Sequence, residues 1–385
     1  MLKIKIVHVI ESLCFGGAQR FVVDLCNEVA KIDKYDVYII SLCENDPNHS
    51  IVNDINLNVN YISFKKGTGI GITALVRLTK WLKNESPHIV HSHLNAYEYL
   101  LLYRMFNSST SFFHTIHKPA NIECANSFFK KIRAGSYRNH QVTPISISQS
   151  SSKAFRSYYK LNNDIIIQSA RPELEVTVAQ LELRAKYKDG SYLMVHVGNI
   201  TDGKNQQLLV RAIQMYNLTA LKKCRLVLIG EVRNQPLFHQ LTELLKHDYF
   251  IEFIGAKHNV ADYLSLADGF CLSSTFEGMP ISLIEAMSMG CIPICTPVGA
   301  IKEIIVDGVT GFLSKEIDVD SYCKALKRAL DFGDKDGIRY NVQKVYKKKY
   351  QIKISAFNHI HIYKKALNLF EGRDNAFELL YKSKT

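Results

Sequence analysis

Residues 269–296 read GFCLSSTFEGMPISLIEAMSMGCIPICT, and this stretch decides the fold class of the chain. Two short apolar runs within it, Gly269–Ser273 and Ile292–Thr296, have the length of buried strands. The run between them, Pro280–Met289, predicts a helix, because a proline suits its first position and Gly290 follows its last. A strand, a helix and a second strand in this order are typical of a parallel sheet.

The same alternation continues on both sides of this stretch. A first series of strand-length runs starts at the N-terminus, and a second begins at Tyr192–Gly198, after the polar stretch Gln180–Ser191. Because the two series have similar length, we expect an α/β protein with two Rossmann-like domains, 1–169 and 170–350, rather than one large sheet. In the first series the expected strands are Ile4–Ile10, Asp36–Cys43, Pro87–Ser92, Ser111–His117 and Thr143–Ser148, and the expected helices are Gln19–Lys31 and Ile72–Glu85.

Length and composition fit a globular protein of two or three domains, with 385 residues of which 47% are hydrophobic. No apolar run approaches the ~18–20 residues of a membrane-spanning helix, and Met1–Val7 alternates like a strand instead of forming a signal peptide. The nine cysteines are scattered, which is typical of reduced thiols in a cytoplasmic protein. Cys291 and Cys295 are spaced as metal ligands can be, but no second ligand pair accompanies them, so a core strand is the better interpretation.

The net charge of +12 is concentrated in two segments. Residues 118–171 hold nine Lys or Arg against two Asp or Glu, and residues 339–385 hold eleven against three. Such clusters attract the phosphates of nucleic acid or of anionic lipid, and the alternative is a solvated face without a partner. Because the chain has no nucleic-acid recognition motif, we expect no nucleic-acid partner and keep a basic nucleic-acid-binding protein only as a remote alternative.

Two glycine-containing loops follow expected strands and open expected helices. Gly16 and Gly17 come after the first strand, and the loop from Gly198 to Lys204 comes after the first strand of the second series. Glycine lets the backbone approach a ligand, and a helix N-terminus favours an anion, to which Lys204 adds positive charge. Neither loop matches a dinucleotide-binding fingerprint. Taken alone, the glycine pair could equally be a tight turn and the lysine a solvated side chain.

Two glutamates accompany the helix expected after residue 279. Glu277 lies just before it and Glu285 lies more than one turn inside it. The backbone N–H groups over residues 278–282 lack helical partners and can hold a phosphate. The two carboxylates can accept hydrogen bonds from vicinal hydroxyls of a sugar or a ribose. The alternatives are a partner of the helix dipole for Glu277 and an ordinary surface position for Glu285.

These stretches resemble glycosyltransferase family 4, whose members have the GT-B fold. Glu277 and Glu285 match the E-x7-E motif of that family, and the segment from Gly198 to Lys204 is similar to its G-R-x4-K phosphate loop. The resemblance runs through most of the second half of the chain and is thinner in the first half. Further similar stretches are Ala267–Phe270, Ser273–Ser274, Glu285–Gly290, Pro297–Gly299, Glu303–Leu313, Gly16–Arg20, Pro87–His93 and Thr115–His117.

The resemblance implies two Rossmann-like domains facing across a cleft, with a C-terminal segment, 351–385, whose helix crosses back to the first domain. It also implies that a sugar is transferred from a UDP- or GDP-linked donor with retention at the anomeric carbon, and with no cofactor and no obligatory metal. By position, it implies catalytic roles for Glu277, Lys204 and His117, with Glu277 on the transferred sugar and Lys204 on the diphosphate. The implied donor-binding residues are Gly16, Gly17, Gly198, Asn199, Lys204, Gly278, Met279, Pro280, Ile281 and Glu285, of which Glu285 would bind the ribose.

Two positions depart from the family pattern. Asn199 stands where the family has an arginine, so a cation is missing there, and Arg233 is a candidate substitute. The stretch Ile167–Pro172 lacks the Asn-Gly that the family shows at the crossing between domains. Of the histidines that end strands, we expect His117, or alternatively His93, to serve the acceptor, while an H-x-H pair without a carboxylate is a poor metal site.

The expected function is retaining transfer of a sugar to a saccharide, with a lipid-linked saccharide as the expected acceptor, in bacterial-type surface polysaccharide or glycolipid synthesis. The two basic segments are expected on the acceptor half, where Phe128–Arg133 mixes aromatic and basic residues as membrane-interfacial segments do. We therefore expect a cytoplasmic protein that docks on the anionic inner face of the plasma membrane. A sugar-nucleotide epimerase of the same fold is the nearer alternative.

Overall fold

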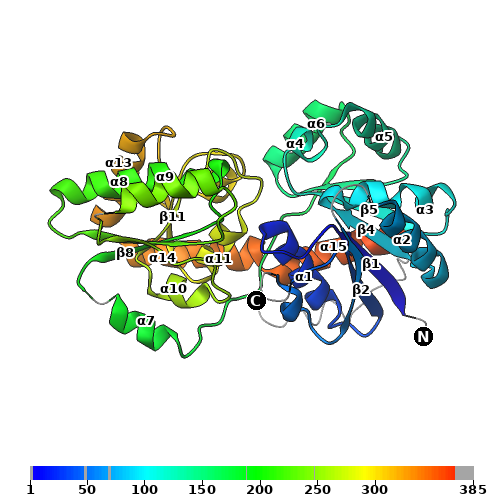
Figure 1. The fold of residues 1–385 in the computed structure, drawn as a ribbon, viewed down its shortest axis with the longest axis horizontal. Helices are drawn as coiled ribbons and strands as arrows, with labels where there is room; N and C mark the ends of the chain where they lie inside the picture. The colour runs from blue at the N-terminus through cyan, green and yellow to red at the C-terminus, as the bar shows by residue number, and fades with distance from the viewer. Residues whose placement is uncertain (1–2, 47–49, 68–70, 188, 247, 369–385) are drawn as a thin grey trace. The chain divides into compact units, whose positions relative to one another are not determined.

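The computed structural model of the protein describes residues 3–46, 50–67, 71–187, 189–246 and 248–368. The chain forms two compact units, one made of Met1–Pro172 and the segment that starts at Gln351, the other of Glu173–Tyr350. Each unit contains one parallel sheet with helices packed on it, which confirms the expected α/β class with two Rossmann-like sheets (Figure 1). Among the described residues, no helix combines the length and the apolar character needed to cross a membrane.

The first unit is built on a seven-stranded sheet with the strand order β3-β2-β1-β4-β5-β6-β7, in which all neighbours are parallel. The central strand β1 buries almost all of its side chains, as its run of Ile and Val predicts. Strand β3 at the edge was not expected, because its half-buried sequence VNYISFKK has no continuous apolar run. The strands are β1 (Ile4–Ile10), β2 (Tyr35–Cys43), β3 (Val59–Lys66), β4 (Ile89–His93), β5 (Ser111–Ile116), β6 (Thr143–Ser146) and β7 (Ile165–Ile166).

Helix α15 (Ile352–Ala366) follows the second unit in the chain but belongs to the first, where it packs against α1 (Gly17–Val29) (Figure 1). This confirms the expected return of a C-terminal helix; the rest of that segment, 369–385, lies outside the described residues. Arg171 links the two helices, because its carbonyl accepts a 2.9 Å hydrogen bond from the N–H of Ile352 and its guanidinium pairs with buried Asp24. The other helices are α2 (Ile72–Glu85), η3 (Leu94–Leu100), α3 (Leu101–Met105), α4 (Ala120–Glu123), α5 (Ser127–Arg138) and α6 (Gln149–Tyr159).

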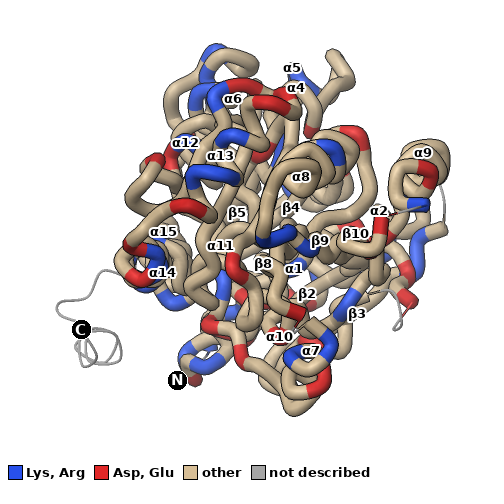
Figure 2. The backbone as a smooth tube through the Cα atoms, turned by 90° about the vertical axis from the view of Figure 1, so that its left-hand side faces the viewer, with Lys and Arg blue, Asp and Glu red and all other residues tan. Residues whose placement is uncertain are grey.

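The second unit is built on a six-stranded parallel sheet with the order β10-β9-β8-β11-β12-β13. Helix α7 (Gln180–Lys186) occupies most of the polar stretch that separates the two series, and it packs on α10 (Ala261–Leu266). Acidic and basic positions are interspersed on α7 (Figure 2). The other elements are β8 (Tyr192–Val197), α8 (Gln206–Thr219), β9 (Cys224–Ile229), α9 (Gln235–Leu245), β10 (Ile251–Phe253), β11 (Gly269–Leu272), α11 (Ile281–Ser288), β12 (Ile292–Cys295), α12 (Ile301–Ile304), β13 (Phe312–Leu313), α13 (Val319–Asp331) and α14 (Lys335–Val345).

The strand–helix–strand unit predicted from residues 269–296 is present as β11, α11 and β12. Its helix begins one residue later than expected, because Pro280 has extended backbone angles and acts as the N-cap. Gly290 follows the helix with a φ of +71°, a left-handed conformation that favours glycine and ends the helix. The loop with Glu277 therefore lies at the carboxyl end of β11, where parallel sheets bind ligands.

The basic segments are not confined to the first unit as expected. Residues 339–350 belong to the second unit, because the chain leaves that unit only after Tyr350. Two of the arginines in 118–171 are also internal: Arg133 pairs with Glu98 at 2.6 Å, and Arg171 pairs with Asp24. Arg373, Lys382 and Lys384 lie outside the described residues.

Candidate active site

In the second unit, the loop after β8 is fixed against the loop after β9. The N–H of Gly198 donates to the carbonyl of Ile229 at 2.8 Å. A Cβ on Gly230 would lie 2.2 Å from the carbonyl oxygen of Gly198, so the two backbones touch at a point where only glycine fits. This close contact holds the turn that ends at Lys204, directly before helix α8.

Lys204 and Glu277 form the centre of this site, although 73 residues separate them in the chain. Nζ of Lys204 lies 2.6 Å from Oε1 of Glu277, and the two side chains are 25% and 10% exposed. The same carboxylate oxygen accepts a 2.6 Å hydrogen bond from the hydroxyl of Ser274. The sequence interpretation did not assign Ser274 a role in the site, because a serine after a strand carries no distinctive signal.

The backbone around these two side chains is held by further contacts. The hydroxyl of Ser273 donates to the carbonyls of Lys204 and Asn205, and the N–H of Thr275 donates to the carbonyl of Gly203 at 2.9 Å. Gly299 closes over Glu277, since a Cβ there would lie 1.7 Å from the carbonyl oxygen of Glu277. The site is therefore built from three loops whose backbones are tied together.

The start of α11 supplies the free N–H groups that the sequence predicted, with one correction. Pro280 has no N–H, so the donors of residues 278–282 are those of Gly278, Met279, Ile281 and Ser282. Ile281 and Ser282 are the first two residues of the helix and have no acceptor within it. Glu285 lies one turn inside α11 and is almost buried, as are Met279 and Ile281.

Asn199 and Arg233 lie in the two loops that meet at Gly198. Oδ1 of Asn199 accepts a 3.1 Å hydrogen bond from the N–H of Glu231, so this side chain ties the loops together. Arg233 forms an ion pair with Glu231. Arg233, the candidate substitute for the missing arginine, is therefore already paired with Glu231 in its own loop.

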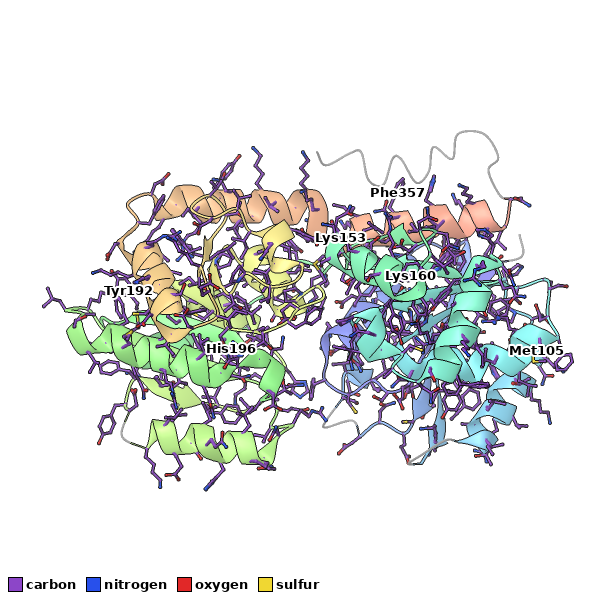
Figure 3. The ribbon with its side chains drawn as sticks, turned by 90° about the horizontal axis from the view of Figure 1, so that it is seen from above. Met105, Lys153, Lys160, Tyr192, His196 and Phe357 are labelled. Carbon is purple, nitrogen blue, oxygen red and sulfur yellow. The ribbon has the colours of Figure 1, made fainter. Side chains whose placement is uncertain are left out.

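A neutral histidine lies next to the loop from Gly198 to Lys204. His196 on β8 is fully buried, and its Nδ1 lies 2.9 Å from the carbonyl oxygen of Cys271 (Figure 3). Burial lowers the pKa of His196 to about 4, so the ring adds no charge next to Lys204. Its Nε2 lies 3.3 Å from the amide nitrogen of Gln206, which also donates to the carbonyl of Asn199 at 2.9 Å.

In the first unit, Gly16 directly precedes α1 and Gly17 is the first residue of that helix. Gly16 is the N-cap of α1 and its carbonyl accepts from the N–H of Arg20 at 3.0 Å. Arg20 pairs with Asp54 at 2.6 Å, which holds the first turn of the helix. Because the first N–H groups of any helix have no acceptor within it, those at the start of α1 can serve as donors.

His117 and His93 lie together at the carboxyl ends of β5 and β4. Nδ1 of His93 is 3.0 Å from Nε2 of His117, and Nε2 of His93 is 3.0 Å from Nδ1 of His8 on β1. His93 is fully buried, whereas His117 keeps partial exposure. Burial lowers the pKa of His117 to about 4. Both rings are therefore neutral near pH 7.

Glu123 on α4 was missed by the sequence interpretation, yet it fixes the backbone of this site. Its Oε2 accepts from the N–H groups of His117 and Lys118, at 2.8 and 3.2 Å. Its Oε1 lies 2.9 Å from Nε2 of His114. Although burial alone would raise the pKa of Glu123, the hydrogen bond from His114 and the charge of Arg133 hold it below its usual range.

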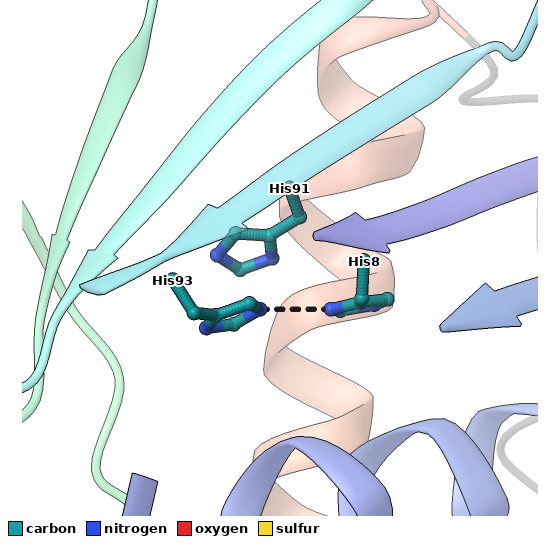
Figure 4. Close-up of side chains that lie close together, drawn as sticks. All are labelled: His8, His91 and His93. Atoms are coloured by element: carbon teal, nitrogen blue, oxygen red, sulfur yellow. Dashed lines mark hydrogen bonds between the residues drawn. The ribbon is translucent and has the colours of Figure 1, made fainter. Parts of the chain in front are cut away.

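One group of described residues has the spacing of metal ligands: ring nitrogens of His8, His91 and His93 all lie within 4.8 Å of one another (Figure 4). Both nitrogens of His91 and of His93 are already engaged, because Nδ1 of His91 lies 2.6 Å from the hydroxyl of Tyr363, Nε2 of His91 lies 2.8 Å from that of Thr115, and His93 contacts His8 and His117. A metal ion would have to displace such hydrogen bonds inside a fully buried cluster.

Comparison with known proteins agrees with the division of the chain into two units. The family described as "Glycosyl transferases group 1" matches residues 180–345, and "Glycosyltransferase Family 4" matches residues 15–167. The chain is also similar in fold to HepE from Anabaena in complex with UDP and glucose. The TM-score is 0.79, the sequence identity is 14%, and the match covers 94% of this chain and 100% of that one.

Two curated bacterial enzymes are similar in sequence over part of their length. One is the N-acetylgalactosamine-N,N'-diacetylbacillosaminyl-diphospho-undecaprenol 4-alpha-N-acetylgalactosaminyltransferase of Campylobacter jejuni, 30% identical over 46% of this chain and 46% of that protein. The other is the UDP-Gal:alpha-D-GlcNAc-diphosphoundecaprenol alpha-1,3-galactosyltransferase of Escherichia coli, 28% identical over 37% of this chain and 38% of that protein. The match thus spans less than half of either relative. Since one family matches each unit and the sheets have the expected topology, the chain belongs to the glycosyltransferases of family 4 and has the GT-B fold.

Proposed function

We propose that this glycosyltransferase moves a sugar from a UDP- or GDP-linked donor to a saccharide, with retention at the anomeric carbon. The observation that carries the proposal is the 2.6 Å pair between Lys204 and Glu277, placed just before the start of α11. A lysine and helix N–H groups without helical partners suit a diphosphate, and a carboxylate suits the hydroxyls of a sugar.

Both members of the ion pair, Lys204 and Glu277, can contact a substrate while they remain paired. Oε1 of Glu277 is occupied by Lys204 and Ser274, while Oε2 has no hydrogen-bond partner among the described residues. That oxygen can accept from a sugar hydroxyl without breaking the existing contacts. The ammonium of Lys204 has three N–H donors, so it can bind a phosphate oxygen while it still contacts Glu277.

The chemistry requires stabilisation of the leaving group. The bond between the anomeric carbon and a diphosphate oxygen breaks, and negative charge remains on the diphosphate. Lys204 and the N–H groups of Ile281 and Ser282 would take up this charge. The acceptor oxygen forms its new bond on the face that the diphosphate leaves, and its proton passes to the departing phosphate oxygen, which retains the anomeric configuration.

The remaining residues have supporting roles in the proposal. Glu285 binds the ribose, and the backbone of Gly198, Asn199, Gly278 and Met279 lines the phosphates. Gly16 and Gly17 present their N–H groups to the donor phosphates and the acceptor. His117 contacts the sugar, and His93 acts on the acceptor side through His117, because His93 itself is fully buried.

We further propose a lipid-linked saccharide as acceptor. The names of both bacterial relatives include a diphospho-undecaprenol saccharide, which supports an acceptor of this class. Such an acceptor would place the enzyme on the inner face of the plasma membrane, as a peripheral protein of the cytoplasm.

A surface of the first unit fits this location, and we name it the α4–α6 patch. Its exposed apolar side chains are Ile122 and Phe128, which are 58% and 64% exposed. Its exposed lysines include Lys131 on α5, and Lys153 and Lys160 on and after α6 (Figure 3). The elements are joined, because α4 packs on α6 and Lys130 of α5 lies 4.0 Å above the ring of Tyr158 of α6. Apolar side chains among lysines suit an anionic membrane surface.

The donor is identified by a thermal-shift panel of UDP-, GDP-, ADP- and CDP-sugars on wild type and on Glu285→Ala. One nucleotide should stabilise the wild type, and the shift should be lost in the variant. Lys246→Met is the matched control, because its exposed pair with Glu243 lies on the surface of the same unit. Response to none of the nucleotides contradicts the proposal. Turnover of the donor without any acceptor, giving an epimerised sugar nucleotide, favours the epimerase alternative.

Flotation with vesicles tests the membrane part. The protein should float with vesicles that contain anionic lipid and not with neutral ones, and Lys131→Glu combined with Lys153→Glu should abolish this. The matched control is Lys222→Glu with Lys246→Glu in the second unit, which should float like the wild type. Equal recovery with neutral and anionic vesicles contradicts membrane docking and leaves the transfer reaction untouched.

A further inference from the structure

Three imidazoles of the first unit form a continuous hydrogen-bonded chain. Nδ1 of His8 lies 3.0 Å from Nε2 of His93, and Nδ1 of His93 lies 3.0 Å from Nε2 of His117 (Figure 4 shows the first bond). The rings come from β1, from β4 and from the end of β5, so three adjacent strands supply one ring each. Within the described residues, no hydrogen bond other than these involves the ring nitrogens of the three histidines.

The two ends of this chain differ. At the inner end, Nε2 of His8 is fully buried and has no hydrogen-bond partner. At the outer end, Nδ1 of His117 also lacks a partner among the described residues, but His117 is partly exposed. The outer nitrogen is thus the one that a ligand could meet.

The number of protons in the chain limits its tautomers. Each neutral imidazole carries one N–H, and each of the two hydrogen bonds needs one proton. Only two arrangements satisfy both bonds. Either all three rings carry the proton on Nδ1, or all three carry it on Nε2, so the tautomer of one ring sets that of the others.

The buried inner end selects between the two arrangements. With protons on Nε2, His8 would bury an N–H donor that has no acceptor. With protons on Nδ1, His8 leaves only an acceptor nitrogen unpaired. Buried donors without acceptors are rarer in proteins than underused acceptors. In the selected arrangement, His117 presents its Nδ1–H outward.

We propose that His93, backed by His8, is a positioning residue that holds His117 as the Nδ1–H tautomer, so that His117 acts as a hydrogen-bond donor to the substrate and not as a base. The proposal rests on the proposed function for the identity of that substrate, a sugar or phosphate oxygen. The proposed tautomer of His117 does not depend on the proposed function. Burial supports neutral rings, since it lowers the pKa of His8 to about 3 and of His117 to about 4.

The backbone of His117 is held independently of its ring. Oε2 of Glu123 accepts its N–H at 2.8 Å, so the loop position does not depend on His93. The groups facing the ring are Glu123 and Lys118 on its own side, Phe21 of α1 at a ring distance of 6.0 Å, and His114 and His359. A change at His93 should therefore alter the tautomer of His117 more than its location.

The tautomer can be read directly by long-range ¹H–¹⁵N NMR of the full chain labelled at histidine, without any substrate. The signals of His117 are assigned by their loss in His117→Gln. In the wild type we expect Nδ1–H on His117, His93 and His8. In His93→Leu, His117 should return toward the Nε2–H form that free histidine prefers. A wild-type His117 in the Nε2–H form, or three rings with different tautomers, overturns the proposal whether or not His93→Leu folds.

His91→Leu is the matched control. His91 is as buried as His93 and lies two residues away on the same strand and face, but its partners are Tyr363 and Thr115. Its replacement should lower the melting temperature and leave the tautomer of His117 unchanged. A shift of His117 to the Nε2–H form in this control as well would mean a general loss of packing and would refute the specific role of His93.

A double-mutant cycle gives the second readout. His93→Leu should reduce kcat/KM about threefold to tenfold, the value of one hydrogen bond, but should have no further effect when His117 is already Ala. Equal losses in both backgrounds refute action through His117. If the chain transfers no sugar while NMR shows the expected tautomers, the proposed function fails and this inference stands. If transfer occurs while His117 carries its proton on Nε2, the proposed function stands and this inference fails.

Discussion

Replacing Lys204 by methionine separates two effects of one ammonium group. In the free protein the substitution leaves Glu277, only 10% exposed, with the hydroxyl of Ser274 as its remaining hydrogen-bond donor within the described ranges. The loss of a charge-assisted bond from such a group costs about 1–3 kcal/mol of unfolding free energy. For a unit of this size that corresponds to roughly 2–4 °C of melting temperature per kcal/mol.

The effect on catalysis should be larger than the effect on stability. A preorganised donor aimed at a leaving group is worth about 10²–10³-fold in kcat. The charge on the diphosphate grows as the sugar departs, so Lys204→Met should lower kcat more than it raises the Kd of the donor. The assay is single-turnover transfer at saturating donor, with donor affinity measured separately by calorimetry.

The double variant Lys204→Met/Glu277→Gln is the informative control. Because it removes the orphaned carboxylate as well as the lysine, it should recover most of the lost stability and none of the activity. A loss of less than about tenfold in kcat, or a loss confined to donor affinity, would refute the role of Lys204 in leaving-group stabilisation.

Three further predictions follow from packing and charge. Gly299→Ala should lower both melting temperature and donor affinity, because its Cβ would collide with the carbonyl of Glu277, whereas Gly308→Ala, also at positive φ but with open space around it, should cost far less. Tyr363→Phe leaves Nδ1 of buried His91 without its hydroxyl partner and should cost about 1–3 kcal/mol of unfolding free energy in a denaturant titration, while an unchanged midpoint would count against that hydrogen bond. Histidines inside the fold bind protons more weakly than in the unfolded chain, since burial lowers the pKa of His117 from 6.5 to about 4. The stability that these neutral rings contribute should therefore be complete above pH 6.5 and should fall as the pH drops from 6.5 to about 4. A melting temperature that stays flat over this range contradicts their burial.

The fold was predictable because its signal is repeated along the chain. Apolar runs such as Ile4–Ile10 and Ile292–Thr296 fill buried parallel strands, and glycine marks the end of α11. Strand β3 was not predictable in the same way, since an edge strand needs only one buried face. The helices α5 and α6 were also missed, because their apolar residues are few among lysines and serines.

The site was predictable where chemistry and spacing coincide. Lys204 and Glu277 were both singled out, and the structure brings them to 2.6 Å. Ser274 and Glu123 were missed because a single polar residue near a strand end has no sequence signature. The charge count also misled for Arg133, because composition does not reveal that an arginine will be buried with Glu98 and Glu123.

The return of α15 to the first sheet has a consequence for biosynthesis. Ribosomes release the chain from its N-terminus, so β1, β4 and β5 emerge long before Ile352–Ala366 does. Until α15 arrives, His91 lacks the hydroxyl of Tyr363, and the face of the sheet that carries His91 lacks the part of its cover that α15 provides. The first unit is therefore completed only after the second unit has been translated, and a truncation that removes Ile352–Ala366 would destabilise the sheet built from the N-terminal strands.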